Sequence, residues 1–252
     1  MSKLIKGVWD LLELFCEKSH PLGVTELSNI MLEGKSLIHK RLKILEELGV
    51  IEQEFYSKKY ILTTKLLELV NKSLSGYYSR TNINKYLQKL TKQTGETSLF
   101  GLKNNRNRII YLDKYNSENL INISTNIGDS PFPHCTAHGK ALLAFLDIDE
   151  IEQVAKNGFK KYTENTINNK KQLVDALKKI RELGYAEDDE ERELGFRCIA
   201  APIFDVRNNV IGAIGISGTI QRLPREKVPE TAEIVKNIAS KVSINIGNNI
   251  IF

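Results

Sequence analysis

Apolar residues recur with helical spacing in the first part of the chain. The first such segment carries one or two on every turn: Leu4, Ile5, Val8, Leu11, Leu12 and Phe15. This spacing predicts an amphipathic helix, which ends before His20 and the proline that follows it. A second, shorter helix follows, and we expect its inner side to carry Leu27, Ile30 and Met31.

A third helix is predicted for residues 35–48, after a tight turn at residues 32–34. Gly49 stands directly after this helix, where a glycine in the left-handed conformation commonly ends a helix. Two short runs of β-type residues follow, 50–55 and 59–62, joined by a three-residue turn. Three helices and a two-stranded ribbon in this order predict a winged helix-turn-helix domain.

The third helix has two chemically different faces. At about 100° per residue, its apolar face consists of Ile38, Leu42, Leu45 and Leu48. The opposite face consists of Ser36, His39, Lys40 and Lys43. Lys35 and Arg41 raise the number of cations to four, with no acid among residues 35–43. Such a helix fits the major groove of DNA, although a solvated helix face is the ordinary alternative, so the prediction depends on the surrounding motif.

Residues 65–79 form one more predicted helix, with an apolar stripe of Leu66, Leu67, Val70 and Leu74. The small domain before this helix offers nothing for the stripe to pack against. Burial in a dimer and packing against a second domain both explain the stripe, and both stay open. We therefore expect a DNA-binding domain at 1–63, a linker helix at 64–79 and a second domain at 80–252.

The second domain alternates helices and strands. The predicted helices are 83–94, 136–146, 151–157, 169–183 and 229–246. The predicted strands are 96–102, 108–115, 119–125, 196–205 and 210–217. Because the strands come in hairpin pairs on either side of a helical block, the sheet should be antiparallel and covered by helices. The fold class is therefore α+β, with the outline of a ligand-sensing domain.

The last hairpin presents small residues on one face. With a two-residue turn at Asn208 and Asn209, Ala200 would lie opposite Ser217. Because side chains alternate along a strand, one face then consists of Phe196, Cys198, Ala200, Gly215 and Ser217. Small residues at these positions leave room either for a ligand or for a packed helix.

Two further segments have an unusual composition. Residues 131–140, PFPHCTAHGK, place two prolines and several small residues at the start of a helix, where free amide groups bind anions. Residues 187–191 are all acidic, and a solvated loop is the usual meaning of such a run.

Composition narrows the class of protein. The 252 residues are 41% hydrophobic and 27% charged, which excludes intrinsic disorder, and the net charge of +5 permits a nucleic-acid partner without requiring one. The three cysteines, Cys16, Cys135 and Cys198, form no CxxC motif, so we expect neither a disulfide framework nor a four-cysteine zinc site. We find no signal-peptide pattern and no apolar run of membrane-spanning length, so we expect a cytoplasmic protein without a membrane partner.

Several motifs resemble the IclR family of transcriptional regulators. They are KSLIHK at 35–40, LEELG at 45–49, PHCTAHGKALLA at 133–144, DDEERELGFRCIAAPIFD at 188–205 and IGISG at 214–218. The resemblance extends from the first helix to about residue 246, with the motifs in the family's order. It implies a winged-helix domain, a linker helix and a GAF-like effector domain, in dimers or tetramers. It also implies that a small organic molecule, often a carboxylate, changes operator binding.

The resemblance implies site residues as well. In the effector domain they are Ala137, His138, Asp188, Phe196, Cys198, Gly215 and Ser217. On the DNA side, the matching positions and their cationic neighbours are Lys35, Ser36, His39, Lys40 and Lys43.

The sequence departs from the family pattern at four of its positions. Lys40 stands where the family commonly has arginine, which removes the bidentate fork for guanine, and Leu37 replaces a usual threonine. His138 occupies a position that is usually small or aliphatic, and Gly215 replaces a frequent serine. The pocket has lost one hydroxyl and gained one imidazole, so its ligand should differ from those of relatives.

Two other functions can be assembled from the same residues. A metal-responsive regulator would use His134, His138, Asp188 and Cys198 as ligands. A cysteine hydrolase would use Cys135 or Cys198 as nucleophile, but no nucleophile-elbow motif accompanies them. The favoured prediction has no metal, cofactor or catalytic residue: a dimeric or tetrameric repressor that binds double-stranded operator DNA and a small organic acid.

Overall fold

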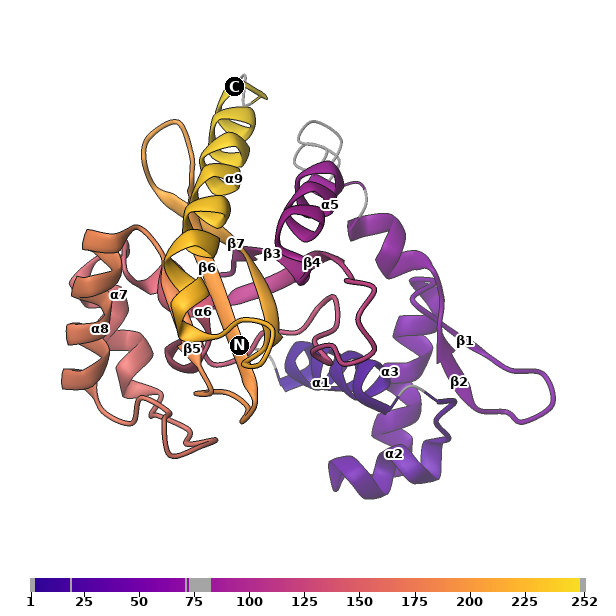
Figure 1. Ribbon diagram of the computed structural model, residues 1–252. Coiled ribbons are helices and arrows are strands. Elements are labelled where there is room, and N and C mark those ends of the chain that lie inside the picture. The colour runs from indigo at the N-terminus through magenta and orange to yellow at the C-terminus, as the bar shows by residue number, and fades with distance from the viewer. Residues whose placement is uncertain (1–2, 19, 71, 73–82, 250–252) are drawn as a thin grey trace. The chain divides into compact units, whose positions relative to one another are not determined.

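The computed structural model describes residues 3–18, 20–70, 72 and 83–249 (Figure 1). The chain divides into two compact units, Met1–Gly76 and Tyr77–Phe252. Residues 65–70 and residue 72 are helical, in agreement with the start of the expected linker helix. The rest of that expected helix, residue 71 and residues 73–79, lies outside the described residues.

The N-terminal unit contains helices followed by a two-stranded ribbon. In chain order its elements are α1 (Lys3–Lys18), α2 (Val24–Met31), α3 (Lys35–Glu47), β1 (Ile51–Gln53) and β2 (Tyr60–Leu62). The two strands pair antiparallel, and their hairpin projects from the helices as a wing (Figure 1). Leu11, Leu27, Ile38 and Leu42 are fully buried in the core. The predicted winged helix-turn-helix is confirmed, but Ile30 is 43% exposed and does not face inward.

An ion pair fixes the turn between α2 and α3. Leu32 ends α2 in a left-handed conformation (φ 54°), and Glu33 follows it. The buried Arg41 guanidinium donates two hydrogen bonds to the Glu33 carboxylate, one of them 3.0 Å long. Gly7 of α1 passes so close to this guanidinium that any side chain would collide with it. Arg41 therefore belongs to the core, and the exposed face of α3 carries three lysines, not the four cations that the sequence suggests.

The C-terminal unit is built on an antiparallel sheet. Its strands are β3 (Thr97–Lys103), β4 (Ile109–Tyr115), β5 (Ala186–Asp189), β6 (Phe196–Phe204) and β7 (Val210–Thr219), in the order β4-β3-β7-β6-β5. Its helices are α5 (Ile83–Thr94), α6 (Ala137–Leu143), α7 (Ile148–Lys156), α8 (Lys170–Leu183) and α9 (Val228–Asn249), and its short 3₁₀ turns are η1 (Pro133–Cys135) and η2 (Arg225–Lys227). This arrangement confirms the predicted α+β class.

Side-chain alternation divides the core of this unit between the two faces of the sheet. On one face, Phe100 and Ile199 pack among residues of α5 and α9. On the other face, Leu99, Cys198 and Ala200 pack among residues of α6, α7 and α8. The helical block between the two strand pairs therefore covers the face on which the small residues of the last hairpin lie.

The β6–β7 hairpin differs from its predicted register by two residues. Cys198 lies opposite Ser217, and Ala200 lies opposite Gly215. A β-bulge near the end of β6 and a longer turn account for the difference. Because a shift of two residues keeps every side chain on its original face, the predicted face of small residues is retained.

Two further segments differ from their predictions. Residues 119–125, predicted as a strand, have no regular structure and belong to the connection between β4 and η1. Residues 187–191, predicted as a solvated acidic loop, include part of the edge strand β5 and two buried carboxyl groups, Asp188 and Glu191. Glu191 is buried in an ion pair with Lys140, whereas Asp188 accepts hydrogen bonds from two backbone N–H groups. Glu187 and Asp189 of the same run pair with Arg197.

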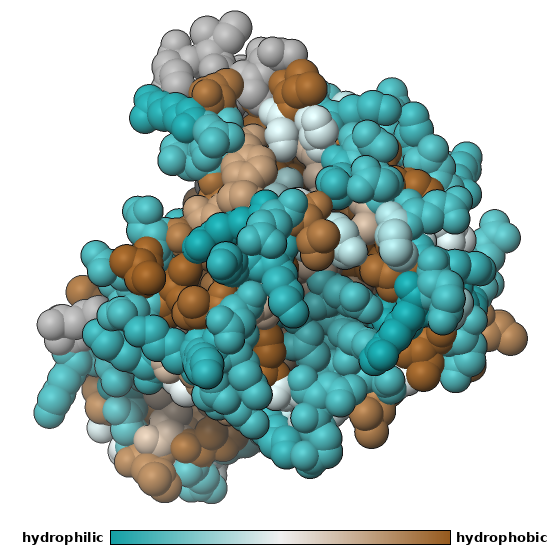
Figure 2. Space-filling model, turned by 60° about the vertical axis from the view of Figure 1, so that its left-hand side comes forward, coloured by the Kyte–Doolittle hydropathy of each residue, from teal (hydrophilic) through white to brown (hydrophobic). Residues whose placement is uncertain are grey.

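The surface shown in Figure 2 is mainly hydrophilic, with apolar side chains in small groups. The large apolar side chains gather in the cores of the two units. Across the described ranges, no helix is long and apolar enough to span a membrane.

Glu33→Gln should lower the free energy of unfolding of the N-terminal unit by about 1–3 kcal/mol, because it leaves the buried Arg41 guanidinium without its counter-ion. Glu26→Gln on α2 is the control: its contacts with Lys59 and His20 are exposed and 4.0 Å long. A change below about 0.5 kcal/mol is expected there. Urea unfolding, followed by the fluorescence of the single tryptophan in α1, measures both. Equal midpoints for the two variants would show that the pair does not stabilise the turn.

Candidate functional site

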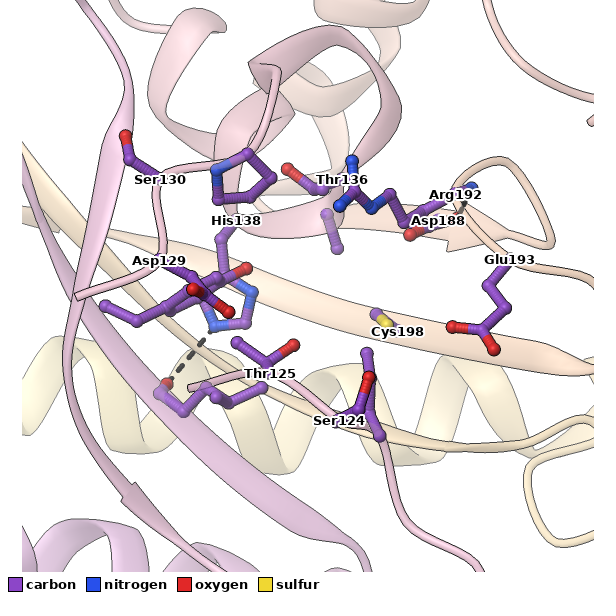
Figure 3. A pocket seen from close by; sticks show the side chains of 15 residues that line it. Ser124, Thr125, Asp129, Ser130, Thr136, His138, Asp188, Arg192, Glu193 and Cys198 are labelled. Carbon is purple, nitrogen blue, oxygen red and sulfur yellow. Dashed lines mark hydrogen bonds between the residues drawn. The ribbon is translucent and has the colours of Figure 1, made fainter. Parts of the chain in front are cut away.

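A cavity of about 290 Å³ lies between the start of α6 and the sheet (Figure 3). The strands contribute Leu99, Tyr111, Asp188 and Cys198. The start of α6 and the β4–η1 and β5–β6 connections contribute Thr136, Ala137, His138, Ile123, Ser124, Thr125, Asp129, Ser130, Pro131, Arg192 and Glu193. We call this the α6 cavity, and its volume suits a small metabolite.

His138 is held in the α6 cavity as a neutral ring. Its Nε2 lies 3.2 Å from the carbonyl oxygen of Leu99, so this nitrogen carries a proton and donates it to the carbonyl. The ring also packs edge-on against Tyr111, with 5.2 Å between the ring centroids. Burial lowers the pKa of His138 to about 4. The imidazole is therefore uncharged at neutral pH, and its Nδ1 is a hydrogen-bond acceptor.

Asp188 is a buried carboxyl group at another end of the α6 cavity (Figure 3). Its Oδ1 accepts hydrogen bonds from the backbone N–H groups of Glu191 (2.9 Å) and Arg192 (3.3 Å). Desolvation raises the pKa of Asp188 to about 7, against the opposing effect of the Lys140 ammonium. Asp188 therefore changes its protonation state near neutral pH, unlike an exposed aspartate.

Glu191 forms a buried ion pair with Lys140 of α6. Desolvation raises the pKa of Glu191, and the Lys140 ammonium opposes that rise. Because separating two buried charges leaves each without compensation, the pair holds the β5–β6 connection against α6. Arg192 and Glu193, which follow in the chain, are positioned at the cavity by this contact.

Arg192 supplies the guanidinium of the cavity lining. Its Cζ lies 4.4 Å from the centroid of the Tyr162 ring, which orients the side chain. The other polar side chains of the lining are those of His138, Cys198, Tyr111, Asp129, Asp188, Glu193, Ser124, Thr125, Ser130 and Thr136. Figure 3 shows Arg192 beside Asp188, with Asp129 and Ser130 on the far side. A ligand that has a carboxylate at one end and hydroxyls along its length matches these groups.

The structure brings together four of the predicted effector residues in the α6 cavity: Ala137, His138, Asp188 and Cys198. Ser217 lies outside the lining, and its hydroxyl accepts a hydrogen bond from the Cys198 thiol (3.2 Å). Gly215 also lies outside the lining. A Cβ at this position would be 2.7 Å from the Ala200 Cα of the neighbouring strand, so a side chain here would push β6 and β7 apart. Phe196 starts β6 and does not reach the cavity. A glycine at position 215 therefore allows β7 to lie close to β6, and its backbone is not part of the cavity wall.

The cavity contains polar residues that sequence reasoning missed. They are Ser124, Thr125, Asp129, Ser130, Arg192 and Glu193. The first two fall in the segment that alternation wrongly predicts as a strand, and the last two follow the acidic run. A usable signal was present, because short polar residues crowd the segment directly before the unusual proline-containing helix start.

The predicted DNA-binding side chains lie on the exposed face of α3: Lys35, Ser36, His39, Lys40 and Lys43. The first four border a shallow groove whose other side is formed by Val24 and Thr25 at the start of α2. Lys43 lies 4.0 Å from Glu47 in an exposed pair. The face therefore offers three ammonium groups, a hydroxyl and an imidazole to a partner.

A family model described as Bacterial transcriptional regulator IclR C-terminal matches residues 72–244. The HTH-type transcriptional regulator KdgR of Escherichia coli (strain K12) is 34% identical over 248 residues, which are 98% of this chain and 93% of KdgR. The chain belongs to the IclR family. The Transcriptional repressor IclR of the same strain is 28% identical over 98% of this chain and 90% of its own length.

A solved IclR homologue from Microbacterium hydrocarbonoxydans, complexed with 4-hydroxybenzoate, has the same fold as this regulator. Its TM-score is 0.84 at 17% identity, over 97% of this chain and 99% of that one. The resemblance found in the sequence is thus confirmed: the protein is an IclR-type helix-turn-helix transcriptional regulator with a GAF-like C-terminal effector domain. Members of this family are transcriptional regulators, not enzymes.

Neither alternative function has support in the regulator. Within the described residues, no group of three or more His, Cys, Asp or Glu could hold a metal ion. His134 Nε2 lies 3.1 Å from the carbonyl of Lys160, whereas His138 Nε2 meets a strand carbonyl, so the two rings are engaged at different places. Burial raises the pKa of Cys135 to about 12 and that of Cys198 well above its usual range. Neither thiol is a thiolate at neutral pH, which a nucleophile requires.

Asp188→Asn should make the regulator more stable relative to the wild type as the pH rises. With its raised pKa, folded Asp188 keeps a proton that the unfolded chain has released, so the wild type loses stability between about pH 4 and 7. The variant has no such loss, and its advantage should grow by about 2–3 kcal/mol from pH 5 to pH 8, because one pKa unit corresponds to about 1.4 kcal/mol. Urea unfolding followed by circular dichroism at both pH values measures this. Asp175→Asn on α8, at an exposed position, is the control, and its stability should depend on pH as that of the wild type does. If the stability of Asp188→Asn also followed the wild type, Asp188 would not titrate near neutral pH in the folded protein.

Proposed function

We propose that this regulator binds operator DNA through α3, and that a small hydroxylated organic acid in the α6 cavity changes its affinity for the operator. The observation that carries the proposal is the cavity itself. A guanidinium, a buried carboxyl group and several hydroxyls converge on about 290 Å³ within the effector domain. As a regulator that binds operator DNA, it would work in the cytoplasm.

On the DNA side, we assign α3 to the major groove. Lys35, Lys40 and Lys43 would neutralise phosphates, and Ser36 and His39 would reach base edges. Lys40 supplies a point charge, whereas an arginine at this position would donate two parallel hydrogen bonds to a guanine. We therefore expect Lys40 to discriminate between bases less strongly than an arginine would. Two copies of α3 would meet the two half-sites of a near-palindromic operator, which requires a dimer or a tetramer of the chain.

On the effector side, we assign the carboxylate of the ligand to Arg192. Its hydroxyls would bond to the polar groups of the lining, including His138 Nδ1, and Ala137 and Cys198 would line the apolar part of the cavity. Ser217 would act through its hydrogen bond to Cys198, and Gly215 and Phe196 through the strands. The Microbacterium homologue, complexed with 4-hydroxybenzoate, supports a small carboxylate as a ligand of this fold.

The effector would act by a difference in its affinity for two states of the regulator, one competent to bind DNA and one not. A coupling free energy of about 1–3 kcal/mol between the two sites would suffice for control. We propose that the regulator is a repressor. The Escherichia coli repressor IclR, which is similar to it, aligns with 98% of this chain. The residues 64–79 between the two units are the proposed linker.

Lys40→Ala and Lys43→Ala should each weaken operator binding and reduce the slope of log Kd against log salt by about 1, because each removes one phosphate contact. The probe is a short duplex that the wild-type regulator selects from a random pool, and fluorescence anisotropy gives Kd at several salt concentrations. Lys18→Ala on α1 also removes an exposed charge, away from α3 in the chain, and should leave Kd and slope unchanged. An unchanged slope in both α3 variants would contradict their assignment to phosphates.

A thermal-shift screen of hydroxylated organic acids should find a ligand, and Arg192→Gln should bind that ligand about 10–100-fold more weakly, since a charge-assisted hydrogen-bond pair is lost. Isothermal titration calorimetry measures the affinity. Arg106→Gln in the β3–β4 turn is the control and should bind as the wild type does. Equal affinity in the Arg192 and Arg106 variants would show that Arg192 does not hold the carboxylate.

A further inference from the structure

The guanidinium of Arg192 lines the α6 cavity, and no carboxylate of the described residues pairs with it. Arg197 on β6, in contrast, pairs with Asp189. The Cys135 thiol accepts a hydrogen bond from Arg192, but a neutral thiol is a weak acceptor. The protein therefore leaves the positive charge of Arg192 without a counter-ion, and that charge is available to an anionic ligand.

Two acids that could neutralise Arg192 lie in the same lining. The Asp188 carboxyl group accepts a hydrogen bond from the backbone N–H of Arg192 (3.3 Å), and Glu193 is the next residue in the chain. Figure 3 shows the side chains of Arg192 and Asp188 beside each other. An arginine side chain has several rotatable bonds, so an unrestrained guanidinium would turn toward one of these carboxyl groups. Binding of an anion therefore requires a contact that keeps the guanidinium unpaired.

The ring of Tyr162 provides such a contact. The Arg192 Cζ lies over this ring, 4.4 Å from its centroid, which is within the range of a cation–π interaction. A guanidinium that lies over an aromatic ring keeps its N–H groups free, because the ring contacts the flat face of the cation. Tyr162 does not belong to the cavity lining. The ring therefore restrains Arg192 without using its hydrogen-bond donors and without touching a ligand.

Hydrogen bonds fix the segment that carries this ring, the α7–α8 connection, to the β5–β6 connection. The Thr163 hydroxyl donates to the carbonyl of Glu190 (2.7 Å), and the Thr166 hydroxyl donates to the carbonyl of Glu191 (2.6 Å). The Thr166 oxygen also accepts the backbone N–H of Tyr162 (3.1 Å). The ring and the guanidinium are thus carried by two segments that are bonded to each other. Their relative position does not depend on the cation–π contact alone.

The α7–α8 connection is also bonded to the start of α6. The carbonyl oxygen of Lys160 lies 3.1 Å from Nε2 of His134, which stands in η1 directly before α6. The Lys160 ammonium lies 5.1 Å from the centroid of the Tyr162 ring. In the chain, Tyr162 therefore stands between two anchor points, one on η1 and one on the β5–β6 connection. Both of these segments border the α6 cavity or directly precede a part of it.

We propose that Tyr162 is a positioning residue of the effector site. Its ring keeps the Arg192 guanidinium unpaired and directed at the cavity, so the affinity for an anion depends on a side chain outside the lining. This inference rests on the proposed function, in which Arg192 binds the carboxylate of the ligand. Without the ring, the guanidinium would pair with Asp188 or Glu193, and an anionic ligand would have to break that pair. A neutral ligand would gain nothing from the ring.

The test uses the full chain and two probes: the tightest-binding hydroxylated acid of the thermal-shift screen, and the carboxamide of that acid. Tyr162→Leu should bind the acid about 3–30-fold more weakly, which is the range of a cation–π contact. Tyr162→Phe should bind it within about twofold of the wild type, because the Tyr162 hydroxyl has no hydrogen-bond partner among the described residues. Isothermal titration calorimetry measures the affinities. Leu194→Ala, at a position 67% exposed in the β5–β6 connection, is the control and should bind as the wild type does.

A double-mutant cycle separates positioning from a purely structural role. In the Arg192→Gln background, Tyr162→Leu should change the affinity for the acid by less than about twofold, because no guanidinium is left to hold. The carboxamide should bind equally well to the wild type and to Tyr162→Leu. A loss of the same size in both backgrounds, or for both probes, would show that the ring only supports the fold, and would overturn the inference.

Phenylalanines with one, two and three ring fluorines at position 162 test the interaction without changing the shape of the ring. Fluorine withdraws electron density from the face of the ring, so the affinity for the acid should fall with each fluorine. Equal affinity across the series would overturn the inference. The series also replaces Tyr162→Leu if that variant does not fold.

Failure of the proposed function gives a different result. If the screen finds no ligand, or if Arg192→Gln binds the acid as tightly as the wild type, the proposed function is overturned and this inference with it. If Arg192→Gln weakens binding about 10–100-fold while Tyr162→Leu stays within about twofold of the wild type, only the role of Tyr162 is overturned.

Discussion

The α6 cavity depends on the buried ion pair between Lys140 and Glu191. Lys140 lies on the helix that also carries Ala137 and His138, whereas Glu191 lies in the β5–β6 connection, next to Arg192. Two buried charges cannot separate without losing the attraction that offsets their desolvation. The helix and the connection are therefore held together, and the two ends of the cavity keep a constant spacing. The same pair accounts for one acid of the run at residues 187–191, and Arg197 pairs with two more, Glu187 and Asp189.

A similar contact organises the DNA-binding unit. Arg41 is buried against Glu33, and a glycine on α1 leaves the space that its guanidinium occupies. Arg41, in the middle of α3, thus holds the turn before the helix and does not belong to the exposed face that we propose for DNA. The exposed lysines remain free of such a structural role, so they are available for phosphates. In each unit, a buried ion pair stabilises the fold: Arg41 with Glu33, and Lys140 with Glu191. The charges that we propose for DNA and effector belong to other residues.

The sequence predicts local structure well and cavity residues poorly. The helices of the N-terminal unit and both hairpins of the sheet follow from periodicity within single segments. The edge strand β5 does not, because acidic residues have low β-propensity and pair here with β6 under the influence of Arg197. Residues 119–125 show the opposite error: their alternation favours a strand, yet they serve as the wall of the α6 cavity. The presence or absence of a neighbouring strand, which lies elsewhere in the chain, decided each case.

By itself, the sequence determined the helices of the N-terminal unit, both hairpins of the sheet, the polar face of α3, the face of small residues on the last hairpin, and the family. All of these depend on patterns within one segment, and a register shift of two residues left the hairpin face unchanged because side chains alternate with a period of two. Only the tertiary structure decided which charges are buried in pairs, why Gly215 lacks a side chain, and which polar residues of two connections surround the α6 cavity. Those features depend on contacts between residues far apart in the chain, which no local pattern records.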